Sequence, residues 1–388
     1  MKDSQKAPIW IFTLGYPGQD GGIAVYAQEV ASGLYRAGEE VMVLAGNVNP
    51  DDVILDQGSP FTILRFPRVR NKLCNLFFRF RVLVTAWRMR EPRFVIATEW
   101  FSAGIVVWVL SHFIRLPYIV VAHGNEILRC KGRLMLRWLL AHVLTRAERV
   151  VAVSRYTQHM IEELVEGLPV NFIPNGVSLE SVRSNRGPEN LLKQLGLHDE
   201  QIILSLGRLI QRKGHDMVLE ALPTVLEAFP EAIWLIAGKG SYQSILQQKI
   251  RAMGLRDHVR LLGYIDKADK GDYFRLSDVY VLVSRTIESE NEVEGFGITY
   301  LEASACKIPI VAGRSGGVED AVVDGVTGIL VDPYSPPAIA KAIIRLLSDK
   351  EYARRLGENG YQRAVQQYSW DGYVSRLRDA VPEHLWKL

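Results

Sequence analysis

The chain has 388 residues, of which 48% are hydrophobic and 23% charged, and its formal net charge is +3. This length admits two domains with buried cores, and the near-average composition excludes a disordered or fibrous protein. The small net charge and the lack of an RNA-binding signature argue against a nucleic-acid partner. The cysteines, Cys74, Cys130 and Cys306, lack metal-ligand spacing and predict a reducing, cytoplasmic setting. No apolar stretch reaches the roughly 18 residues of a membrane span.

The first half of the chain alternates short apolar runs, rich in β-branched residues, with longer amphipathic segments. The runs cover residues 9–14, 40–46, 94–98, 118–123 and 149–154. This alternation predicts βαβ units around a parallel sheet that is buried on both faces. A polar, turn-rich stretch follows, and it predicts an interdomain linker at residues 179–199.

A second series of apolar runs begins after this linker. The runs cover residues 202–207, 232–238, 259–264, 278–284, 308–313 and 327–332. We therefore expect an α/β protein with two doubly wound Rossmann-like domains, residues 1–178 and 200–368, facing a central cleft. A final helix, residues 369–388, is expected to return to the first domain. Ligands of this architecture bind at the carboxyl ends of the strands, so the segments that follow strands carry most functional information.

Gly21 and Gly22 follow the first predicted strand and precede a predicted helix. Free N–H groups at a helix N-terminus can meet an anion, which makes this segment a candidate phosphate loop. An ordinary glycine turn between strand and helix is the alternative. The spacing matches neither GxGxxG nor a Walker loop, which argues against a dinucleotide dehydrogenase and a P-loop NTPase.

The segment "SLGRLIQRKG" places Gly207 and Arg208 at the end of a strand, with Arg212 and Lys213 shortly after. Arginine offers a planar fork to phosphate oxygens and lysine a point charge, so the set suits a diphosphate. The alternative is that these are simply solvated basic residues. "AGKGS" (237–241) repeats the pattern: its glycines let the backbone approach a ligand, or form an ordinary strand-to-helix turn.

The segment "EVEGFGITYLE" (292–302) follows a further strand and loop and carries two carboxylates, Glu294 and Glu302. If a helix starts near Gly297, its free N–H groups form an anion site beside the basic residues of the preceding motif. Eight residues on a helix give about 12 Å of rise and about 80° of rotation, so both carboxylates would face one groove. Hydroxyl groups at each end with a phosphate between them describe a nucleotide sugar. In the alternative, Glu294 caps the helix and Glu302 is a surface acid.

Taken in order, these segments resemble the motifs of the retaining GT-B glycosyltransferases of the glycosyltransferase family 4 type. The resemblance covers nearly the whole chain. It rests on "GG" after the first strand, "HGNE" (123–126), "NGV" (175–177), "GR…RKG" (207–214), "GKGS" (238–241), and Glu294…Glu302 as the family's E-x7-E element. Residues 284–303 look most like the mannosyltransferases and related glycolipid enzymes. The implied architecture is the GT-B fold, with the first domain binding the acceptor.

The resemblance implies a role for each matching residue. Glu294 would bind the donor-sugar hydroxyls, and Arg208 and Lys213 would neutralise the departing diphosphate. His123 would help to position the anomeric centre; the alternative is a strand-end histidine that a neighbour satisfies. Glu302 would hold the ribose hydroxyls. The other donor-binding residues would be Gly21, Gly22, Gly207, Gly238, Gly240, Tyr264, Ile265, Gly295, Phe296 and Gly297, with Tyr264 and Ile265 at the nucleotide base.

The implied reaction breaks the bond between a sugar and a nucleoside diphosphate, GDP or UDP, and transfers the sugar with retention of configuration. Cationic side chains and helix N-termini would stabilise the leaving phosphate, so neither a metal nor a further cofactor is expected. No DxD motif follows a strand, and "DKADKGD" (266–272) is interpreted as a solvated loop. No protein nucleophile is assigned, because the family is generally thought to use front-face attack assisted by the leaving phosphate.

Two cationic, apolar segments suggest where the acceptor is met. Residues 68–90 carry seven basic residues and no acid, and residues 131–146 are similar in character. Residues 1–190 contain 22 Lys and Arg against 17 Asp and Glu. These features predict peripheral binding to an anionic membrane, at the cytoplasmic face of the inner membrane, and a glycolipid, lipopolysaccharide or polysaccharide-precursor acceptor. The alternative is two core helices with snorkelling arginines.

Two other functions fit the same architecture. A sugar-nucleotide epimerase or hydrolase would keep the diphosphate site but would need a different acid/base set. A non-catalytic protein could keep the nucleotide-sugar pocket alone. The presence of Glu294, Glu302, Arg208 and Lys213 favours a transferase and leaves both alternatives open.

Overall fold

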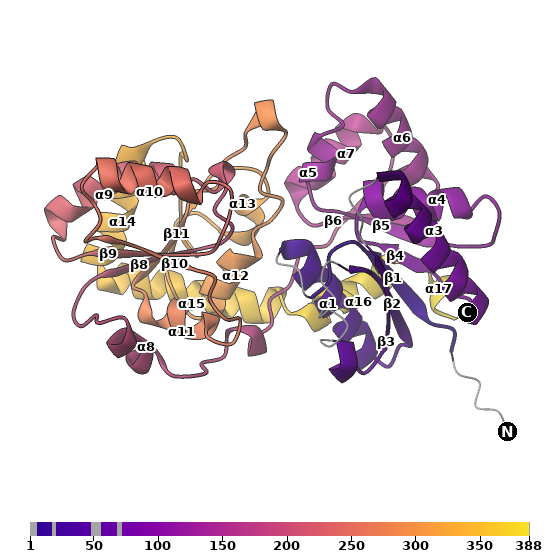
Figure 1. Ribbon diagram of the computed structural model, residues 1–388, viewed down its shortest axis with the longest axis horizontal. Coiled ribbons are helices and arrows are strands. Elements are labelled where there is room, and N and C mark those ends of the chain that lie inside the picture. The colour runs from indigo at the N-terminus through magenta and orange to yellow at the C-terminus, as the bar shows by residue number, and fades with distance from the viewer. Residues whose placement is uncertain (1–5, 18–20, 48–55, 68–71, 388) are drawn as a thin grey trace. The chain divides into compact units, whose positions relative to one another are not determined.

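The computed structural model describes residues 6–17, 21–47, 56–67 and 72–387, and the chain divides into two compact units. The first unit comprises Met1–Asn175 together with Trp370–Leu388, and the second comprises Gly176–Ser369. Figure 1 shows both as α/β units, with the C-terminal helices in yellow. Each unit is built on its own parallel sheet.

The sheet of the first unit has seven strands within the described ranges, all parallel, in the order β3-β2-β1-β4-β5-β6-β7. The strands are β1 (Ile9–Thr13), β2 (Val41–Asn47), β3 (Thr62–Pro67), β4 (Val95–Ala97), β5 (Tyr118–Ala122), β6 (Arg149–Ala152) and β7 (Val170–Phe172). The side chains of β1 and β5 are buried along their whole length, as expected for central strands covered on both faces. The edge strands β3 and β7 were not predicted from the sequence.

Helices cover both faces of this sheet. They are α1 (Gly22–Arg36), η1 (Asp56–Gly58), α3 (Lys72–Met89), η2 (Trp100–Gly104), α4 (Ile105–Leu110), α5 (Asn125–Leu128), α6 (Leu134–Thr145), α7 (Arg155–Leu164), α16 (Trp370–Ala380) and α17 (Glu383–Trp386). The C-terminal α16 packs on α1, where the hydroxyls of Tyr26 and Tyr373 lie 2.6 Å apart in the interior. The guanidinium of Arg36 also donates to Asp371 at 2.7 Å. The end of the chain therefore belongs structurally to the first unit.

The second sheet has six parallel strands among the described residues, in the order β10-β9-β8-β11-β12-β13. They are β8 (Ile202–Leu206), β9 (Ile233–Ala237), β10 (Val259–Gly263), β11 (Val279–Leu282), β12 (Ile310–Gly313) and β13 (Ile329–Val331). Because the strands are parallel, their carboxyl ends meet at one edge. Gly207, Gly238, Tyr264 and Ser284 follow four adjacent strands there, so this edge gathers the polar segments predicted to bind a ligand.

The helices of the second unit form two layers around its sheet. They are η3 (Glu180–Val182), α8 (Pro188–Gln194), η4 (Gln211–Lys213), α9 (His215–Ala228), α10 (Gln243–Ala252), α11 (Lys270–Leu276), η5 (Glu288–Glu290), α12 (Ile298–Ala305), α13 (Val318–Ala321), α14 (Pro336–Ser348) and α15 (Lys350–Gln367). Figure 1 shows α9 and α10 on one side of the strands and α11, α12 and α15 on the other. One core joins α9, α10 and α14 to the sheet through residues such as Val218, Leu246 and Ile343.

Residues 179–199, for which the sequence predicts a linker, are held against α11. The carboxylate of Asp272 accepts hydrogen bonds from the Ser184 hydroxyl, from the Asn185 amide at 3.1 Å and from the Arg186 amide at 2.8 Å. Asp272 is fully buried. The prediction that residues 266–272 form a solvated loop is therefore wrong for their second half, which begins α11 and anchors this segment.

Candidate functional site

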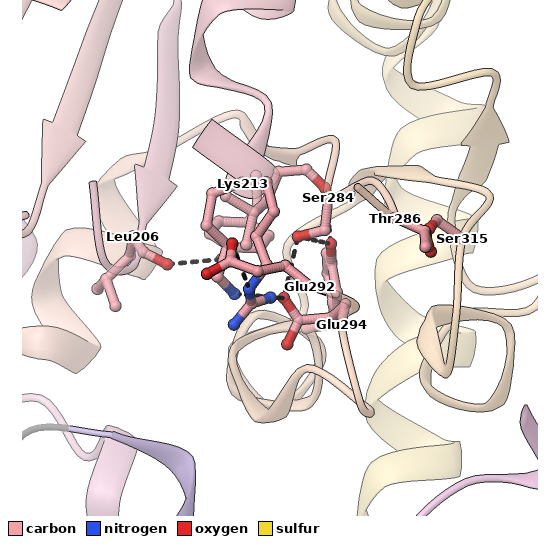
Figure 2. A network of polar contacts seen from close by, with 11 residues as sticks. Leu206, Lys213, Ser284, Thr286, Glu292, Glu294 and Ser315 are labelled. Carbon is pink, nitrogen blue, oxygen red and sulfur yellow. Dashed lines mark hydrogen bonds and ion pairs between the residues drawn. The ribbon is translucent and has the colours of Figure 1, made fainter. Parts of the chain in front are cut away.

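Glu294 lies between η5 and α12, and its side chain is only 9% exposed. Its Oε2 atom accepts hydrogen bonds from Arg212 Nη1 at 2.7 Å, Lys213 Nζ at 2.5 Å and Ser284 Oγ at 3.1 Å. Figure 2 shows this convergence, with Glu292 alongside. The Arg212 Nε atom lies 3.8 Å from Glu292 Oε2. Two cations and one hydroxyl therefore meet on a single carboxylate oxygen.

The backbone explains why these residues meet. Arg212 and Lys213 form η4, a short turn between β8 and α9. Gly214 leaves this turn with φ +73°, and a Cβ there would lie 2.2 Å from the carbonyl oxygen of Val283. The turn thus packs directly on the end of β11, which leads into Ser284. Glycine at 214 permits both the left-handed conformation and the close approach.

Charge pairing fixes the protonation state of Glu294. Burial raises the pKa of this carboxyl. The charges of Lys213 and Arg212, together with the Ser284 hydrogen bond, lower the pKa by more than burial raises it. The resulting pKa lies well below the usual glutamate range, so Glu294 is ionised at neutral pH. Among the described residues, Oε2 takes all the side-chain hydrogen bonds to this carboxylate, and Oε1 has no partner.

Arg208 follows Gly207 at the end of β8 and is exposed to solvent. Partial desolvation, and after it the nearby charge of Arg212, lower the pKa of the Arg208 guanidinium. Arg208, Arg212 and Lys213 therefore form a cationic group with more positive charges than Glu292 and Glu294 neutralise. Such an excess suits an anionic ligand.

The glycines at 207, 238 and 240 bring two loops into backbone contact. A Cβ on Gly238, where φ is +141°, would lie 1.9 Å from the Gly207 carbonyl oxygen. A Cβ on Gly240 would lie 2.1 Å from the Leu209 carbonyl oxygen. Packing within the protein accounts for these glycines, and their role in binding a ligand stays a prediction.

Tyr264 and Ile265 follow β10, on the other side of β9 from Gly207. The Gly238 amide donates to the Gly263 carbonyl at 2.7 Å, which places this loop beside the β9 loop. The Tyr264 ring is 50% exposed and has the Lys239 ammonium 5.9 Å from its centroid. An exposed ring of this kind can stack on a nucleotide base.

The helical geometry expected for the two glutamates is wrong. Helix α12 starts only at Ile298, after Gly297, whose φ is +90°. A Cβ on Gly297 would lie 2.4 Å from the ring of Tyr300. Gly295 and the buried Phe296 precede it outside the helix. Glu294 therefore lies on a loop, and Gly297 rather than Glu294 occupies the N-cap position.

Glu302 lies on α12 and is buried, so it is not a surface acid. Its Oε1 atom accepts a hydrogen bond from Lys270 Nζ at the start of α11. The sequence did not predict this partner, because Lys270 belongs to the segment that was interpreted as a solvated loop. As for Glu294, a cation from a distant segment pairs with the carboxylate.

Gly21, Gly22 and His123 belong to the first unit. Helix α1 begins at Gly22, and Gly21 at its N-cap is exposed, with open space where a side chain would be. One turn later, the ring of Tyr26 packs edge-on against His123, with the ring centroids 5.0 Å apart. The start of α1 and the end of β5 therefore lie close together at the carboxyl edge of the first sheet.

His123 is held as a neutral imidazole. Burial lowers its pKa to about 4, although a hydrogen bond to the Thr98 backbone acts in the opposite direction. The buried Nε2 atom has no partner among the described residues. Glu126 Oε1 accepts a hydrogen bond from the His123 amide at 2.5 Å, and burial raises the pKa of Glu126 to about 7. The sequence pointed to "HGNE" as a motif without assigning Glu126 a role.

The two cationic segments differ in structure. On α3, Leu83 and Ala86 are buried, and Arg79 donates to the Ser102 carbonyl at 3.2 Å. This part of the helix packs as the alternative of a core helix predicts. Residues 68–71 lie outside the described residues. None of the helices that the structure describes is both long and apolar enough to cross a bilayer.

Residues 131–138 at the start of α6, here called the α6 tip, have a different character. Leu134, Met135 and Trp138 are 83%, 78% and 58% exposed, and Lys131 and Arg133 beside them are also exposed. A cluster of large, exposed apolar side chains is typical of a surface that contacts a partner or a membrane.

Comparisons with known proteins agree with this architecture. Residues 20–181 match the family model described as Glycosyltransferase Family 4, and residues 189–363 match that of Glycosyl transferases group 1. The GDP-mannose-dependent alpha-(1-6)-phosphatidylinositol monomannoside mannosyltransferase of Mycolicibacterium smegmatis is 32% identical over 74% of this chain and 76% of its own length. The GDP-mannose-dependent monoacylated alpha-(1-6)-phosphatidylinositol monomannoside mannosyltransferase of Corynebacterium glutamicum is 27% identical over 96% of this chain and 97% of its own length.

Solved structures support the fold. Sucrose-phosphate synthase from Thermosynechococcus elongatus superposes with a TM-score of 0.83 at 24% identity, over 96% of this chain and 98% of that one. Anabaena HepE, solved with UDP and glucose, gives a TM-score of 0.81 at 22% identity, over 96% and 99% of the two chains. With two Rossmann-like units and both family models matched in order, the chain belongs to glycosyltransferase family 4 and is a glycosyltransferase of the GT-B fold.

Proposed function

We propose that this glycosyltransferase moves a mannosyl group from GDP-mannose to a hydroxyl of a glycolipid acceptor, with retention of configuration and without a metal ion. The M. smegmatis and C. glutamicum relatives use GDP-mannose and phosphatidylinositol mannosides. These names favour GDP over UDP and a lipid-linked acceptor over a free polysaccharide. A lipopolysaccharide precursor is also a lipid-linked saccharide with free hydroxyl groups, so it belongs to the same class of acceptor.

The buried Glu294 with its two cations is the observation that carries this proposal. Oε1 of Glu294 has no partner among the described residues, so it is available to accept a hydrogen bond from a sugar hydroxyl. An ionised carboxylate makes such a bond roughly twice as strong as a neutral acceptor does. In this assignment Glu302 with Lys270 would bind the ribose hydroxyls, and Tyr264 would stack on the base.

The leaving diphosphate would bind Arg208 and Lys213 at the carboxyl end of β8. Cations placed where charge develops in the transition state stabilise it directly. As the sugar C1–O bond breaks, both electrons of the bond go to the β-phosphate oxygen. The acceptor oxygen then bonds to C1 on the same face, and its proton goes to the departing phosphate. The neutral imidazole of His123, with Nε2 as an acceptor, would help to hold the sugar.

One assay separates this function from its alternatives. The protein is incubated with UDP-, GDP- and ADP-sugars, with and without membrane extract, and the released nucleotide is measured. Release from GDP-mannose that depends on the extract supports the transferase. Release without any acceptor supports a hydrolase, conversion of the sugar nucleotide without release supports an epimerase, and binding without turnover supports a non-catalytic protein.

A matched pair of variants ties the activity to the site. Glu294→Gln keeps the shape of the side chain but removes its charge, and we expect kcat to fall by about two orders of magnitude or more. Glu288→Gln changes an exposed acid in the preceding turn and should leave kcat unchanged. Equal activity of Glu294→Gln and the wild type would remove the assigned role. Turnover that persists in excess EDTA would support metal independence.

The acceptor side of the proposal places the α6 tip at an anionic membrane surface, on the cytoplasmic side of the membrane. Apolar side chains beside basic ones match the acyl and phosphate layers of a bilayer, and no acid occurs between residues 127 and 147. Arg81 and Arg88 on α3 are also exposed and would add attraction. Arg79 and Arg90 serve internal contacts instead, with the Ser102 and Lys6 carbonyls.

Flotation with phosphatidylcholine vesicles, with and without phosphatidylglycerol, tests this surface at low salt. We expect the wild type to float only with the anionic vesicles. The combined change Leu134→Ser, Met135→Ser and Trp138→Ser should abolish flotation, whereas Ile245→Ser on α10 of the second unit, 44% exposed, should not. Absence of wild-type flotation, or equal flotation of the triple variant, would count against membrane docking through the α6 tip.

A further inference from the structure

Arg212 belongs to the basic set near the donor site but has no individual role there, and it shares the buried oxygen of Glu294 with Lys213. The two cations reach Oε2 from adjacent positions of η4, at 2.7 and 2.5 Å. One cation is enough to balance one carboxylate. The second cation is therefore in excess at this one oxygen, in a place that water hardly reaches, since the three side chains are only 6–9% exposed.

The contacts distinguish a fixed cation from a movable one. Arg212 lies between two acids, Glu294 and Glu292, and its own carbonyl accepts a hydrogen bond from the Arg285 amide at 2.8 Å. Within the described residues, Lys213 Nζ is paired only with Glu294. A lysine ammonium is a point charge on a flexible stem, whereas an arginine fork bridges two partners.

Lys213 also lies on the side where the diphosphate is expected. Its Cε atom is 3.9 Å from the position of a Cβ on Gly207, at the end of β8 and next to Arg208. A rotation of the lysine stem would carry Nζ from Glu294 toward a phosphate on that loop. Removing the sole partner of a buried carboxylate is strongly unfavourable, so this exchange needs a second cation that stays behind.

We infer that Arg212 is a positioning residue: it stays paired with Glu294 when Lys213 moves to the donor's diphosphate, and so keeps that carboxylate charged and fixed. The inference rests on the proposed donor site. Arg212 acts through Glu294 and is not assigned a contact with the donor. Without it, a departing Lys213 would leave Glu294 buried and unpaired, and the carboxyl would take up a proton. A protonated Glu294 would then lose its charge-assisted hydrogen bond to the sugar.

Burial moves the pKa values of the two tyrosines and the histidine around this cluster away from the pH range between 6 and 8. Burial raises the pKa of Tyr280 on β11 and of Tyr300 on α12. Burial, with the charge of Lys213, lowers the pKa of His215 on α9 to about 4. Arg208 is exposed at the end of β8, and the side chain of Glu292 is partly exposed. The terminal phosphate of GDP also titrates at about pH 6, so it is the difference in proton uptake between a variant and the wild type that is assigned to Glu294.

Calorimetry with GDP measures this proton. Titrations at pH 6.5 in buffers of different ionisation enthalpy give the number of protons bound with the nucleotide. Relative to the wild type, we expect Arg212→Gln to take up about half a proton or more, because a buried unpaired carboxyl has a pKa near or above 7. Lys213→Met should bind GDP more weakly without extra uptake, since Arg212 still holds Glu294. Arg212→Lys keeps the charge and should match the wild-type proton count.

The pH dependence of GDP-mannose turnover gives a second readout. Between pH 8 and pH 6.5, kcat/KM of Arg212→Gln should fall about five- to tenfold more than that of the wild type, whereas Arg212→Lys and the exposed control Arg251→Gln should follow the wild-type profile. Equal proton uptake and equal pH profiles in Arg212→Gln and the wild type would overturn this inference and leave the proposed function standing. So would extra uptake in Lys213→Met instead of Arg212→Gln.

Two further outcomes remain distinguishable. If Arg212→Gln does not fold, the Lys213→Met titration still decides which cation stays with Glu294. If the wild type neither binds nor turns over any of the GDP, UDP or ADP ligands, the proposed function itself fails, and the inference fails with it.

Discussion

The ammonium of Lys270 lies 2.5 Å from Oε1 of Glu302, and the two side chains are only 16% and 6% exposed. They come from the first turn of α11 and from the middle of α12. This pair gives Glu302 a fixed orientation, and it leaves Oε2 without a hydrogen bond among the described residues.

A ribose-binding role for Glu302 predicts a change in donor affinity. Ribose hydroxyls are bound equally in the ground and transition states, so Glu302→Gln should raise the KM for GDP-mannose about tenfold or more and leave kcat nearly unchanged. The exposed acid Glu319 on α13, changed to Gln, is the control. A Glu302→Gln enzyme whose kcat falls while its KM stays constant would contradict the assignment.

The buried pair of Asp216 and Arg285 predicts a large effect on stability. Arg285 Nη2 lies 2.8 Å from Asp216 Oδ2, with both side chains less than 10% exposed. Asp216→Ala leaves a buried guanidinium unpaired and should lower the free energy of unfolding by about 3–5 kcal/mol. Glu220→Gln, one turn further along α9, breaks a half-exposed pair with Lys249 and should cost less than about 1 kcal/mol. Chemical denaturation checks both, and similar costs would contradict the prediction.

The central strands could be predicted from the sequence because burial on both faces requires continuous apolar runs, as in β1 and β5. The edge strands could not. Residues 62–67 of β3 are mostly half-exposed, and β7 is three residues long, so neither shows a distinct apolar run. The helix α12 and its start near Gly297 were anticipated, but the left-handed conformation of Gly297 was not, because it depends on the packing of Tyr300.

The residue types of the site were predictable, whereas their partners were not. Glu294 and Lys213 were identified from motifs, but their ion pair spans 81 positions of the chain. From the sequence, Arg212 was interpreted as one of several basic residues, and Lys270 as part of a solvated loop. Local sequence shows which side chains carry charge; only the order of strands β8 and β11 in the sheet shows which charges meet.

The close approach at Gly214 predicts that this glycine supports both the fold and the site. An alanine there would combine positive φ with a Cβ 2.2 Å from the Val283 carbonyl oxygen. Gly254 has a similar φ of +69° but open space around it, so Gly254→Ala carries the conformational cost alone, about 1–2 kcal/mol. We expect Gly214→Ala to lower the melting temperature more than Gly254→Ala does. We also expect it to slow the turnover of GDP-mannose, because η4 carries Lys213. Equal melting temperatures would show that the loop around Gly214 accommodates the added methyl group without loss of stability.

The raised pKa of Glu126 predicts how stability depends on pH. Burial raises this pKa from an ordinary value of 4.5 to about 7, so the fold favours the protonated carboxyl. The contribution is full below pH 4.5 and is lost as the pH rises through 7, with an upper limit of about 3 kcal/mol. Glu126→Gln imitates the protonated form and can still accept the His123 amide. It should therefore be more stable than the wild type at pH 8 and similar to it at pH 5. Denaturant midpoints at the two pH values measure this, with the exposed Glu163→Gln on α7 as the control. A Glu126→Gln protein that loses stability equally at both pH values would show that the carboxylate, and not the acid, holds the turn after β5.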